Sequence, residues 1–322
     1  MRCPTTQILG ALFSTLFLYV SVQAADKIRI AIPNPAPPYL TFPLAQKKGF
    51  LEDEGFAAEI LLMRPTVQIP ALNNGDIDYL TTIPQGVRTA IAGFPLKVMA
   101  CYLPSAALML VSRPEIKSVK ELKGKTIAIS SIGGATFFAL QLIAKHFGLD
   151  PEKDIKVLAV GSNDARLAAL KQGLVAATIA PPPWDFHARK LGFHVIAKSH
   201  EIFSYPQVGL IANEKKIRQR PEEIKRVIRA GIKANRYARS NREGTIQVLI
   251  EWLKIDREFA TATYEAFAPV YSEDGTLPED GLRLVIEEAK TSANIQRQVP
   301  FSDVADLSIL REAQKELGIK VK

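Results

Sequence analysis

The sequence predicts an α/β protein built from two lobes of similar design, and three observations support this prediction. Short apolar runs with strand character alternate with helical patterns, as in α/β units with largely parallel sheets. About 300 residues follow the first 24, a length typical of two domains. A block of sequence also repeats: "ALNNGDIDYLTTIP" begins at Ala71, and "ALKQGLVAATIAPP" begins at Ala169, an offset of 98 residues.

A second match follows the first in the same order. "GFPLKVMA" begins at Gly93 and "GFHVIA" begins at Gly192, an offset of 99 residues. One match alone would mean little, because a glycine that closes a helix is common. Two matches in the same order indicate two similar lobes. Their strand-end loops would face each other across a cleft, where open α/β sheets bind ligands.

The expected elements follow from local patterns. Strand-like runs occupy residues 27–32, 57–62, 77–80, 96–102, 107–112, 125–130, 155–160, 175–180 and 193–197. From Glu214 onward the chain is mostly helical, with helices near 243–255, 257–269, 277–291 and 303–317 that should pack on the first lobe.

A helix that opens at Pro221 shows the clearest pattern. Glu222 and Glu223 suit its first turn, and its apolar stripe consists of Ile224, Val227, Ile228 and Ile232. Its basic residues are expected on a solvated outer face, with membrane binding as the alternative; they are Lys225, Arg226, Arg229, Lys233 and Arg236.

Residues 1–24 have the features of an export signal. Arg2 supplies a positive charge, an apolar run extends over 8–22, and small residues stand at Val22 and Ala24. No cysteine lies beside this cleavage site, which predicts a freely soluble periplasmic protein without a lipid anchor. An uncleaved anchor is the alternative.

Charge and cysteine content exclude several classes of protein. The formal net charge of +8 falls to about +7 once Arg2 is removed, and the basic residues are interspersed with acids. We find no basic run or nucleic-acid motif, so no nucleic-acid partner is expected. Without the leader, Cys101 is the only thiol, which excludes a disulfide framework and a cysteine metal cage.

Motifs for catalysis are absent from the sequence. "LKGKT" at 122–126 lacks the first glycine of a phosphate-binding P-loop, and "SIGGAT" lacks dinucleotide-binding spacing. The four histidines have no neighbours at metal-ligand spacing. We therefore expect no catalytic residue, no cofactor and no metal.

The segment "SSIGGAT" (130–136) lies between a strand-like run and a helical pattern. A helix start of this composition presents unpaired N–H groups and hydroxyls, which suit an anionic or polar ligand group. It could also form only a tight corner between strand and helix, which this stretch by itself favours over a ligand site.

Five stretches in a fixed order resemble the periplasmic substrate-binding proteins of ABC importers. The group is that for nitrate, sulfonate, taurine and thiamine precursors (NitT/TauT), whose members carry an NMT1/THI5-like domain. The stretches are "PLAQKKGFLEDEGF" (43–56), "ALNNGDIDY" (71–79), "AGFPLKVMA" (92–100), "SVKELKGKTIAIS" (118–130) and "NDARLAALKQGLVAATIAPP" (163–182). Together they span nearly the whole chain after the leader.

The resemblance implies a bilobed type II periplasmic-binding-protein fold with two hinge crossings, near 103–112 and 203–209. Lobe one would comprise 26–110 plus 208–322, and lobe two 111–207. It also implies a small-molecule solute and, for the closed form, docking on an ABC permease with its ATPase. We expect a monomer.

Pocket positions carried over from the family lie in strand-end loops. Those of lobe one are Asn34, Tyr39, Arg64, Thr66, Gln68, Thr81 and Thr82. Those of lobe two are Ser130, Ser131, Gly133, Gly134, Ala135, Thr136, Ser162, Asn163, Pro182, Trp184 and Asp185.

Several of these positions have a structural alternative. Arg64 could instead pair with a surface carboxylate, and Trp184 could pack in the core. Thr81 and Thr82 could cap the helix that follows them. The prolines around Tyr39 favour a rigid, exposed loop and hence a pocket role for this residue.

Lobe two departs from the family pattern at one position. Ala176 and Ala177 stand where many members have Asp-Ala, so a standard sulfonate contact set is in doubt. A small, anionic organic solute remains the expected ligand: a sulfonate, a carboxylate or a thiamine-precursor pyrimidine. The alternatives are an enzyme of the thiamine-pyrimidine synthase type on the same fold, and a sensor that presents its ligand to a signalling partner.

Overall fold

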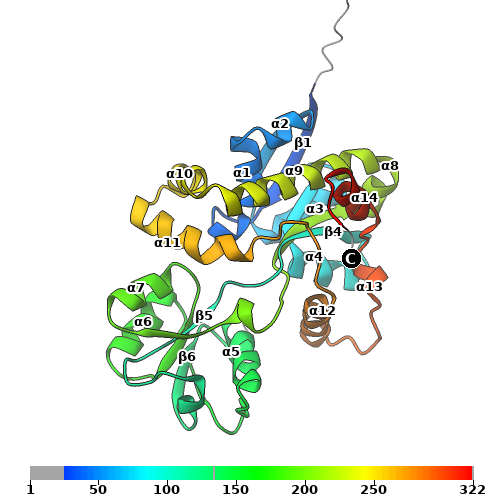
Figure 1. Ribbon diagram of the computed structural model, residues 1–322. Coiled ribbons are helices and arrows are strands. Elements are labelled where there is room, and N and C mark those ends of the chain that lie inside the picture. The colour runs from blue at the N-terminus through cyan, green and yellow to red at the C-terminus, as the bar shows by residue number, and fades with distance from the viewer. Residues whose placement is uncertain (1–24, 133–134, 321–322) are drawn as a thin grey trace, which may run out of the picture.

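The computed structural model describes residues 25–132 and 135–320, so the expected leader lies outside the described residues. Its strands form two five-stranded mixed sheets, which confirms the predicted α/β class (Figure 1). The first sheet contains β2(Phe56–Leu62), β1(Asp26–Ile32), β3(Tyr79–Thr82), β10(Val208–Asn213) and β4(Leu96–Leu103), in that order. The second contains β7(Lys156–Ala159), β6(Thr126–Ile129), β8(Ala177–Ala180), β5(Met109–Ser112) and β9(His194–Lys198).

The two sheets share one topology, which accounts for the repeated sequence. In each sheet, three parallel strands are followed by one antiparallel strand and then by a last strand that runs parallel to the first three. The order β2-β1-β3-β10-β4 in one sheet thus corresponds to β7-β6-β8-β5-β9 in the other. The antiparallel strand in each sheet is the one by which the chain arrives from the other sheet. All nine expected strands are present, whereas β10 was not anticipated.

The chain crosses between the sheets twice, along segments that run side by side. It leaves the first sheet at Leu103, and Met109 already pairs with Ala180 in the second sheet. On the return, the amide of Tyr205 donates to the carbonyl of Pro104 at 3.0 Å, and that of Gln207 donates to Leu103 at 2.9 Å. Residues 104–108 and 202–207 therefore form a hydrogen-bonded pair of connections.

The crossings place the carboxyl ends of both sets of parallel strands opposite each other. β4 and β3 both run antiparallel to β10, so β4 ends at the same edge as β1, β2 and β3, and there the chain leaves. β5 enters the second sheet antiparallel to β8, so its entry edge holds the carboxyl ends of β6, β7 and β8. Ligands bind at such edges in open α/β sheets.

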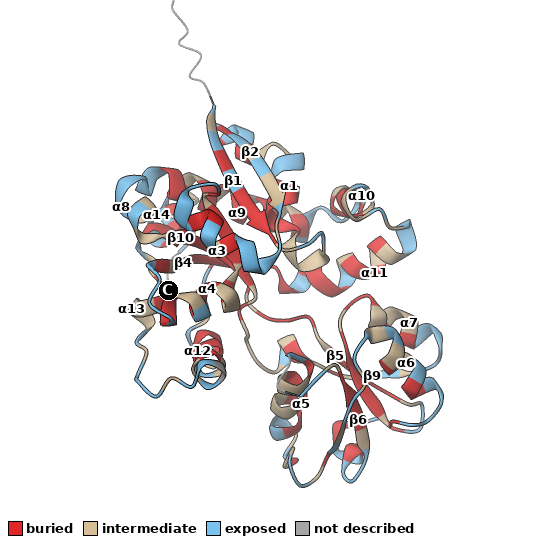
Figure 2. Ribbon diagram, turned by 180° about the vertical axis from the view of Figure 1, so that it is seen from behind, coloured by how far each residue is buried: buried red, intermediate tan, exposed pale blue. Residues whose placement is uncertain are grey.

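Helices cover both faces of the first sheet. Its helices are α1(Thr41–Lys47), α2(Phe50–Asp53), α3(Pro65–Asn74), α4(Ile83–Ile91), α8(Glu214–Gln219), α9(Pro221–Ser240), α10(Arg242–Leu253), α11(Arg257–Phe267), α12(Glu279–Ala293), α13(Phe301–Val304) and α14(Ser308–Glu316). Side chains alternate along β1: Ile28 and Ile30 join the core beneath α1 and α9, and Ala31 joins the core beneath α4 and α12. Figure 2 shows buried residues concentrated in the strands and on the inner sides of the helices.

The second sheet carries α5(Ala135–His146), α6(Asn163–Lys171) and α7(Trp184–Lys190). Short 3₁₀ helices occupy η1(Pro37–Tyr39), η2(Val119–Leu122), η3(Ser199–Glu201) and η4(Ala268–Val270). Among the described residues, no helix has both the length and the apolar character needed to cross a membrane.

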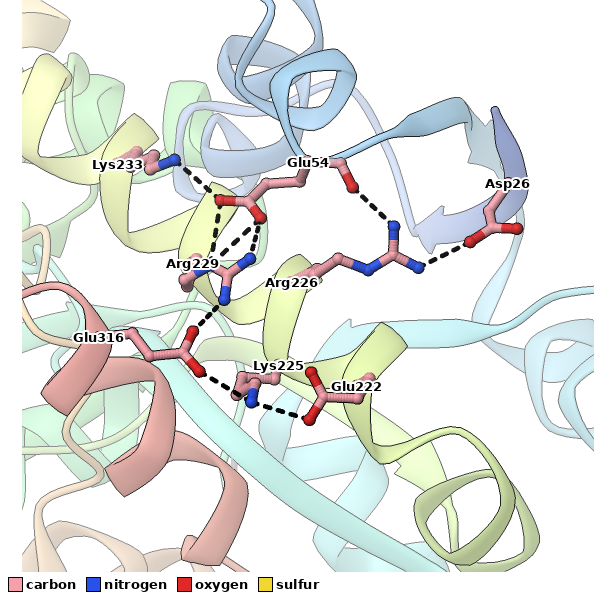
Figure 3. Close-up of polar contacts among 8 residues, drawn as sticks. All are labelled: Asp26, Glu54, Glu222, Lys225, Arg226, Arg229, Lys233 and Glu316. Atoms are coloured by element: carbon pink, nitrogen blue, oxygen red, sulfur yellow. Dashed lines mark hydrogen bonds and ion pairs between the residues drawn. The ribbon is translucent and has the colours of Figure 1, made fainter. Parts of the chain in front are cut away.

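The basic side of α9 differs from its expected role. The apolar stripe is confirmed, since Ile224, Val227, Ile228 and Ile232 are all fully buried. Lys225, however, is also buried, and it pairs with Glu222 and Glu316. Because α2 and α14 bring acids to this side of α9, most of its basic residues form ion pairs within the fold and do not make an open basic face (Figure 3).

Glu54 is the centre of this network. Its carboxylate is 5% exposed and accepts hydrogen bonds from Arg229 Nε at 3.1 Å and Lys233 Nζ at 2.8 Å (Figure 3). Burial by itself raises the pKa of this carboxyl, but the two basic groups outweigh burial and leave the pKa below its ordinary value. The network fastens α2 to α9.

Candidate ligand-binding site

The loop after β1 presents a tyrosine at the carboxyl edge of the first sheet. Tyr39 ends η1, and its hydroxyl lies 3.3 Å from Oγ1 of Thr82 at the end of β3. The hydroxyl of Tyr271 donates to the carbonyl of Pro37 at 2.8 Å, which fixes the start of the same turn. Burial raises the pKa of Tyr39, so its phenol stays protonated at neutral pH and can donate a hydrogen bond. The structure therefore brings two of the expected site residues together.

Two other expected residues of the first lobe point into the fold. Thr81 is 1% exposed and donates to the carbonyl of Ala31 at 2.9 Å, which ties β3 to β1. Gln68 is fully buried, and its Nε2 donates to the carbonyl of Met63 at 2.7 Å. As placed here, both side chains support the backbone and do not face solvent.

Exposed polar groups at this edge come from the loops after β1 and β2. Asn34, Arg64 and Thr66 are all exposed. Arg64 is the N-cap residue of α3, and within the described ranges it makes no ion pair. The expected alternative, a surface carboxylate partner, is thus not seen there, and the guanidinium is accessible to an anion.

Within the "SSIGGAT" segment, hydrogen bonds join Ser130, which follows β6, to Thr136 in the first turn of α5. The amide of Ser130 donates to Oγ1 of Thr136 at 2.9 Å, and the two hydroxyls lie 2.8 Å apart. Thr136 is buried, whereas Ser131 and Ala135 are exposed; Gly133 and Gly134 lie outside the described residues. Because the Thr136 hydroxyl is already engaged, its observed role is to hold the corner together.

The loop after β7 starts α6 with a serine cap. Oγ of Ser162 accepts from the amide of Ala165 at 3.2 Å, and Ser162 itself is exposed. Asn163, the first residue of α6, accepts a hydrogen bond through Oδ1 from the guanidinium of Arg166. Asn163 therefore contacts a residue that the sequence analysis did not identify.

Arg166 is 3% exposed, although it carries a charge. Its guanidinium also donates to the carbonyl of Gly161, which follows β7, and to the carbonyl of Ile179 in β8 at 3.2 Å. Burial lowers the pKa of Arg166. A signal for this residue was present: with Ala169 and Leu170 at the third and fourth positions after it, Arg166 stands on the apolar face of its helix.

The loop after β8 supplies the last group of expected residues. Pro182 and Asp185 are buried, and Asp185 forms an ion pair with Arg189. Burial raises the pKa of Asp185, and this neighbouring arginine acts against the increase. Trp184 is half-buried, and with Asn163 and Arg166 it lines a cavity of about 10 Å³, room for at most one water molecule.

A contact between the lobes lies beside this group. The rings of His187 in α7 and Phe259 in α11 lie 5.3 Å apart, and Lys190 forms an ion pair with Glu258. The ring centroids of Trp184 and His187 are in turn 5.7 Å apart. Within residues 25–132 and 135–320, no three potential metal ligands cluster closely enough to hold an ion.

The fold and its facing strand ends are those of bilobed α/β binding proteins, and solved structures bear this out. The aliphatic sulphonate binding protein SsuA of Escherichia coli matches with a TM-score of 0.70 at 19% identity, over 88% of this chain and 92% of that one. The ligand-binding component of an ABC-type import system from Staphylococcus aureus matches at 0.64 and 15%, over 90% and 99%. The type II periplasmic-binding-protein fold is therefore confirmed.

The chain belongs to the NMT1/THI5-like family, whose model matches residues 37–244. This confirms the resemblance seen in the sequence. A binding protein of Brucella abortus is 23% identical over 244 residues, which cover 74% of this chain and 75% of the relative. The fold also occurs in an enzyme: a mutant of the desulfurization enzyme DSZB, solved in complex with biphenyl-2-sulfinic acid, matches with a TM-score of 0.62 at 16% identity, over 90% and 99%.

Proposed function

We propose that this protein is the solute-binding component of an ABC import system and that it holds a small organic anion between its two sheets. One observation carries the proposal: two sets of strand-end loops face each other across paired crossings, and both sets present polar side chains at that edge. Membership of the NMT1/THI5-like family and likeness to the E. coli and S. aureus binding proteins support it.

Charge at the strand ends favours an anion. Arg64 is exposed and lacks an acidic partner in the described part of the chain, and α5 and α6 both begin at the carboxyl edge of the second sheet. Helix N-termini carry a partial positive charge that adds to this field. The net charge of +8 acts in the same direction over longer distances.

Exposed apolar side chains favour an organic body on the solute. Leu62 at the end of β2 is 59% exposed, Val67 in α3 is 46% exposed, and Ile132 in the loop after β6 is 65% exposed. Large apolar residues at two facing edges suit an aliphatic or aromatic group that is covered when the lobes close.

The proposed partners and compartment follow from the same role. The two sheets would act as lobes, one of residues 26–103 plus 208–322 and the other of residues 109–201, closing about the connections 104–108 and 202–207. The closed monomer would dock on a membrane permease with its ATPase, after export to the periplasm under the direction of residues 1–24. A sensor that presents the same ligand to a signalling partner is the alternative.

Thermal unfolding of the purified protein against four solute classes tests the proposal. The classes are alkanesulfonates, aromatic carboxylates, nitrate and thiamine-related pyrimidines. A solute at one hundred times its Kd should stabilise the fold by about 2.7 kcal/mol, which raises Tm by several degrees. A shift with an organic anion supports the proposal, whereas a shift with the pyrimidine alone or with no class contradicts it.

Enzymatic activity is a second candidate, because DSZB shares the fold. Cys101 lies in β4 and is fully buried, and burial raises its pKa, so this thiol is a poor nucleophile. Incubation with biphenyl-2-sulfinic acid, followed by assay of released inorganic sulfur, distinguishes the two. Release would favour the enzyme, and unchanged recovery of the compound would favour the binding protein.

A further inference from the structure

Five charged side chains are buried among the described residues, and four of them have an opposite charge beside them. Glu54 pairs with Arg229 and Lys233, Glu223 with Lys216 and Arg220, Lys225 with Glu222 and Glu316, and Asp185 with Arg189. The fifth is Arg166. Its partners in the described chain are neutral oxygens of Gly161, Asn163 and Ile179, and its Nε has no hydrogen-bond partner.

An unpaired buried cation is costly, and the position of Arg166 adds to the cost. A buried charge is stable only when an opposite charge or a full set of hydrogen bonds replaces its hydration. Arg166 also lies in the first turn of α6, where the helix dipole repels a cation. A missing negative charge at this point would balance both effects, and helix N-termini accept anions readily.

The guanidinium lies at the edge where the solute is expected. Gly161 follows β7 and Ile179 belongs to β8, so the two carbonyls that hold Arg166 are at or near the carboxyl ends of the second sheet. The exposed Ser162 caps the same helix, and the half-buried Trp184 lines the cavity beside the guanidinium. A solute would reach this group by displacing the side chain of Asn163.

We propose that Arg166 recognises the negative charge of the solute. In this structure its guanidinium donates to the amide oxygen of Asn163, and a carboxylate or sulfonate oxygen of the solute would replace that oxygen as the acceptor. This inference rests on the proposed solute-binding function and assigns the charged end of the solute to the start of α6. The corner at the start of α5 is less suited to that role, because the hydroxyls of Ser130 and Thr136 already bond to each other. Guanidinium groups match planar or tetrahedral oxyanions with two parallel hydrogen bonds.

The test compares charged and neutral forms of one solute. Calorimetry on the full protein measures Kd for butanesulfonate, butyrate and the neutral butanesulfonamide, with wild type, Arg166→Met and Arg166→Lys. Arg166→Met should weaken binding of the preferred anion by about 10- to 100-fold and leave the sulfonamide within about twofold. Arg166→Lys should retain part of the anion affinity, because it keeps the charge without the paired donors.

A matched control separates local charge from net charge. Lys171→Met removes an exposed positive charge from the far end of α6 and should leave both Kd values unchanged. Equal losses for anion and sulfonamide in Arg166→Met would show a purely structural role and overturn the inference. So would unchanged anion binding.

The outcomes also separate this inference from the proposed function. Wild-type protein that binds only the sulfonamide keeps a solute-binding role and overturns the role of Arg166. Wild-type protein that binds none of the three compounds, and no organic anion of the thermal panel, counts against both. Should Arg166→Met fail to fold, the ratio of anion to sulfonamide affinity in Arg166→Lys decides, because a structural role would leave that ratio unchanged.

Discussion

Lys190 of α7 and Glu258 of α11 form an ion pair that joins a helix of the second lobe to a helix of the first. The chain crossings lie elsewhere, so this pair is a contact between the lobes that does not depend on chain connection. Beside it, the rings of His187 and Phe259 lie 5.3 Å apart. Both charged side chains are about half exposed, with 49% and 63% of their surface accessible, so the pair stabilises this arrangement only modestly.

Reversal of one charge in this pair should favour separation of the lobes. Glu258→Lys places two cations together and should weaken binding of the solute found in the thermal panel by up to about fivefold, mainly through faster dissociation. The double variant Lys190→Glu with Glu258→Lys should restore the wild-type Kd. Stopped-flow kinetics measures the effect, and a double variant as weak as the single one would rule out the contact as the cause.

The hydroxyl of Tyr39 should contribute to binding more than to folding. Tyr39→Phe removes the group that lies 3.3 Å from Thr82, while the ring keeps its packing. We expect a loss of about 1 kcal/mol in binding of the same solute and a smaller change in the free energy of unfolding. Tyr264→Phe, whose hydroxyl bonds the carbonyl of Arg239 at 3.4 Å, is the control and should bind normally. If both variants bind alike, Tyr39 is not in the site.

Thr136 should act through the stability of its corner. Thr136→Val removes the oxygen that accepts from the Ser130 amide at 2.9 Å and leaves that partly buried amide unpaired. The free energy of unfolding should fall by about 1–2 kcal/mol, as measured by urea denaturation. Thr136→Ser keeps the hydroxyl and should lose much less. Weaker solute binding by Thr136→Val at unchanged stability would instead favour direct ligand contact, as the sequence analysis expected.

Glu54 should make the fold sensitive to acid. Since its pKa in the folded state lies below the ordinary value of 4.5, its stabilisation is complete above that value and is lost as the pH falls through the folded pKa. Glu54→Gln should lower the free energy of unfolding at pH 7 by about 2–3 kcal/mol, because Arg229 and Lys233 lose a buried partner.

Urea denaturation between pH 7 and pH 3 measures this effect. The difference between wild type and Glu54→Gln should shrink as the pH falls below 4.5, because the wild-type carboxyl then takes up a proton. Glu59→Gln is a suitable control, since Glu59 pairs with Arg29 on the surface with both side chains about half exposed. A constant difference across this pH range would contradict the role given to Glu54.

Most strands could be predicted because their apolar runs are long enough to show the residue pattern of a strand. β10 was missed for an identifiable reason. In the sequence, residues 208–213 form a short apolar stretch between a crossing and a helix. The sequence of such a stretch does not indicate which strands it pairs with. Only the return of the chain from the second sheet inserts it between β3 and β4, where it becomes an interior strand with a neighbour on each side.

The sequence alone determined the alternation of elements, the repeated lobe and the family, because periodicity and ordered motifs are local properties of a chain. The tertiary structure decided which polar side chains turn inward. Thr81 bonds to Ala31, fifty residues away in sequence, and Arg166 bonds to Ile179 in another element. At a strand end, the direction of a side chain depends on acceptors that distant segments bring beside it, and residue type does not reveal those acceptors. Thr81, expected from the sequence to contact the solute, is thus engaged within the fold, and the tertiary structure instead indicates Arg166 as the candidate for contact with a charged solute.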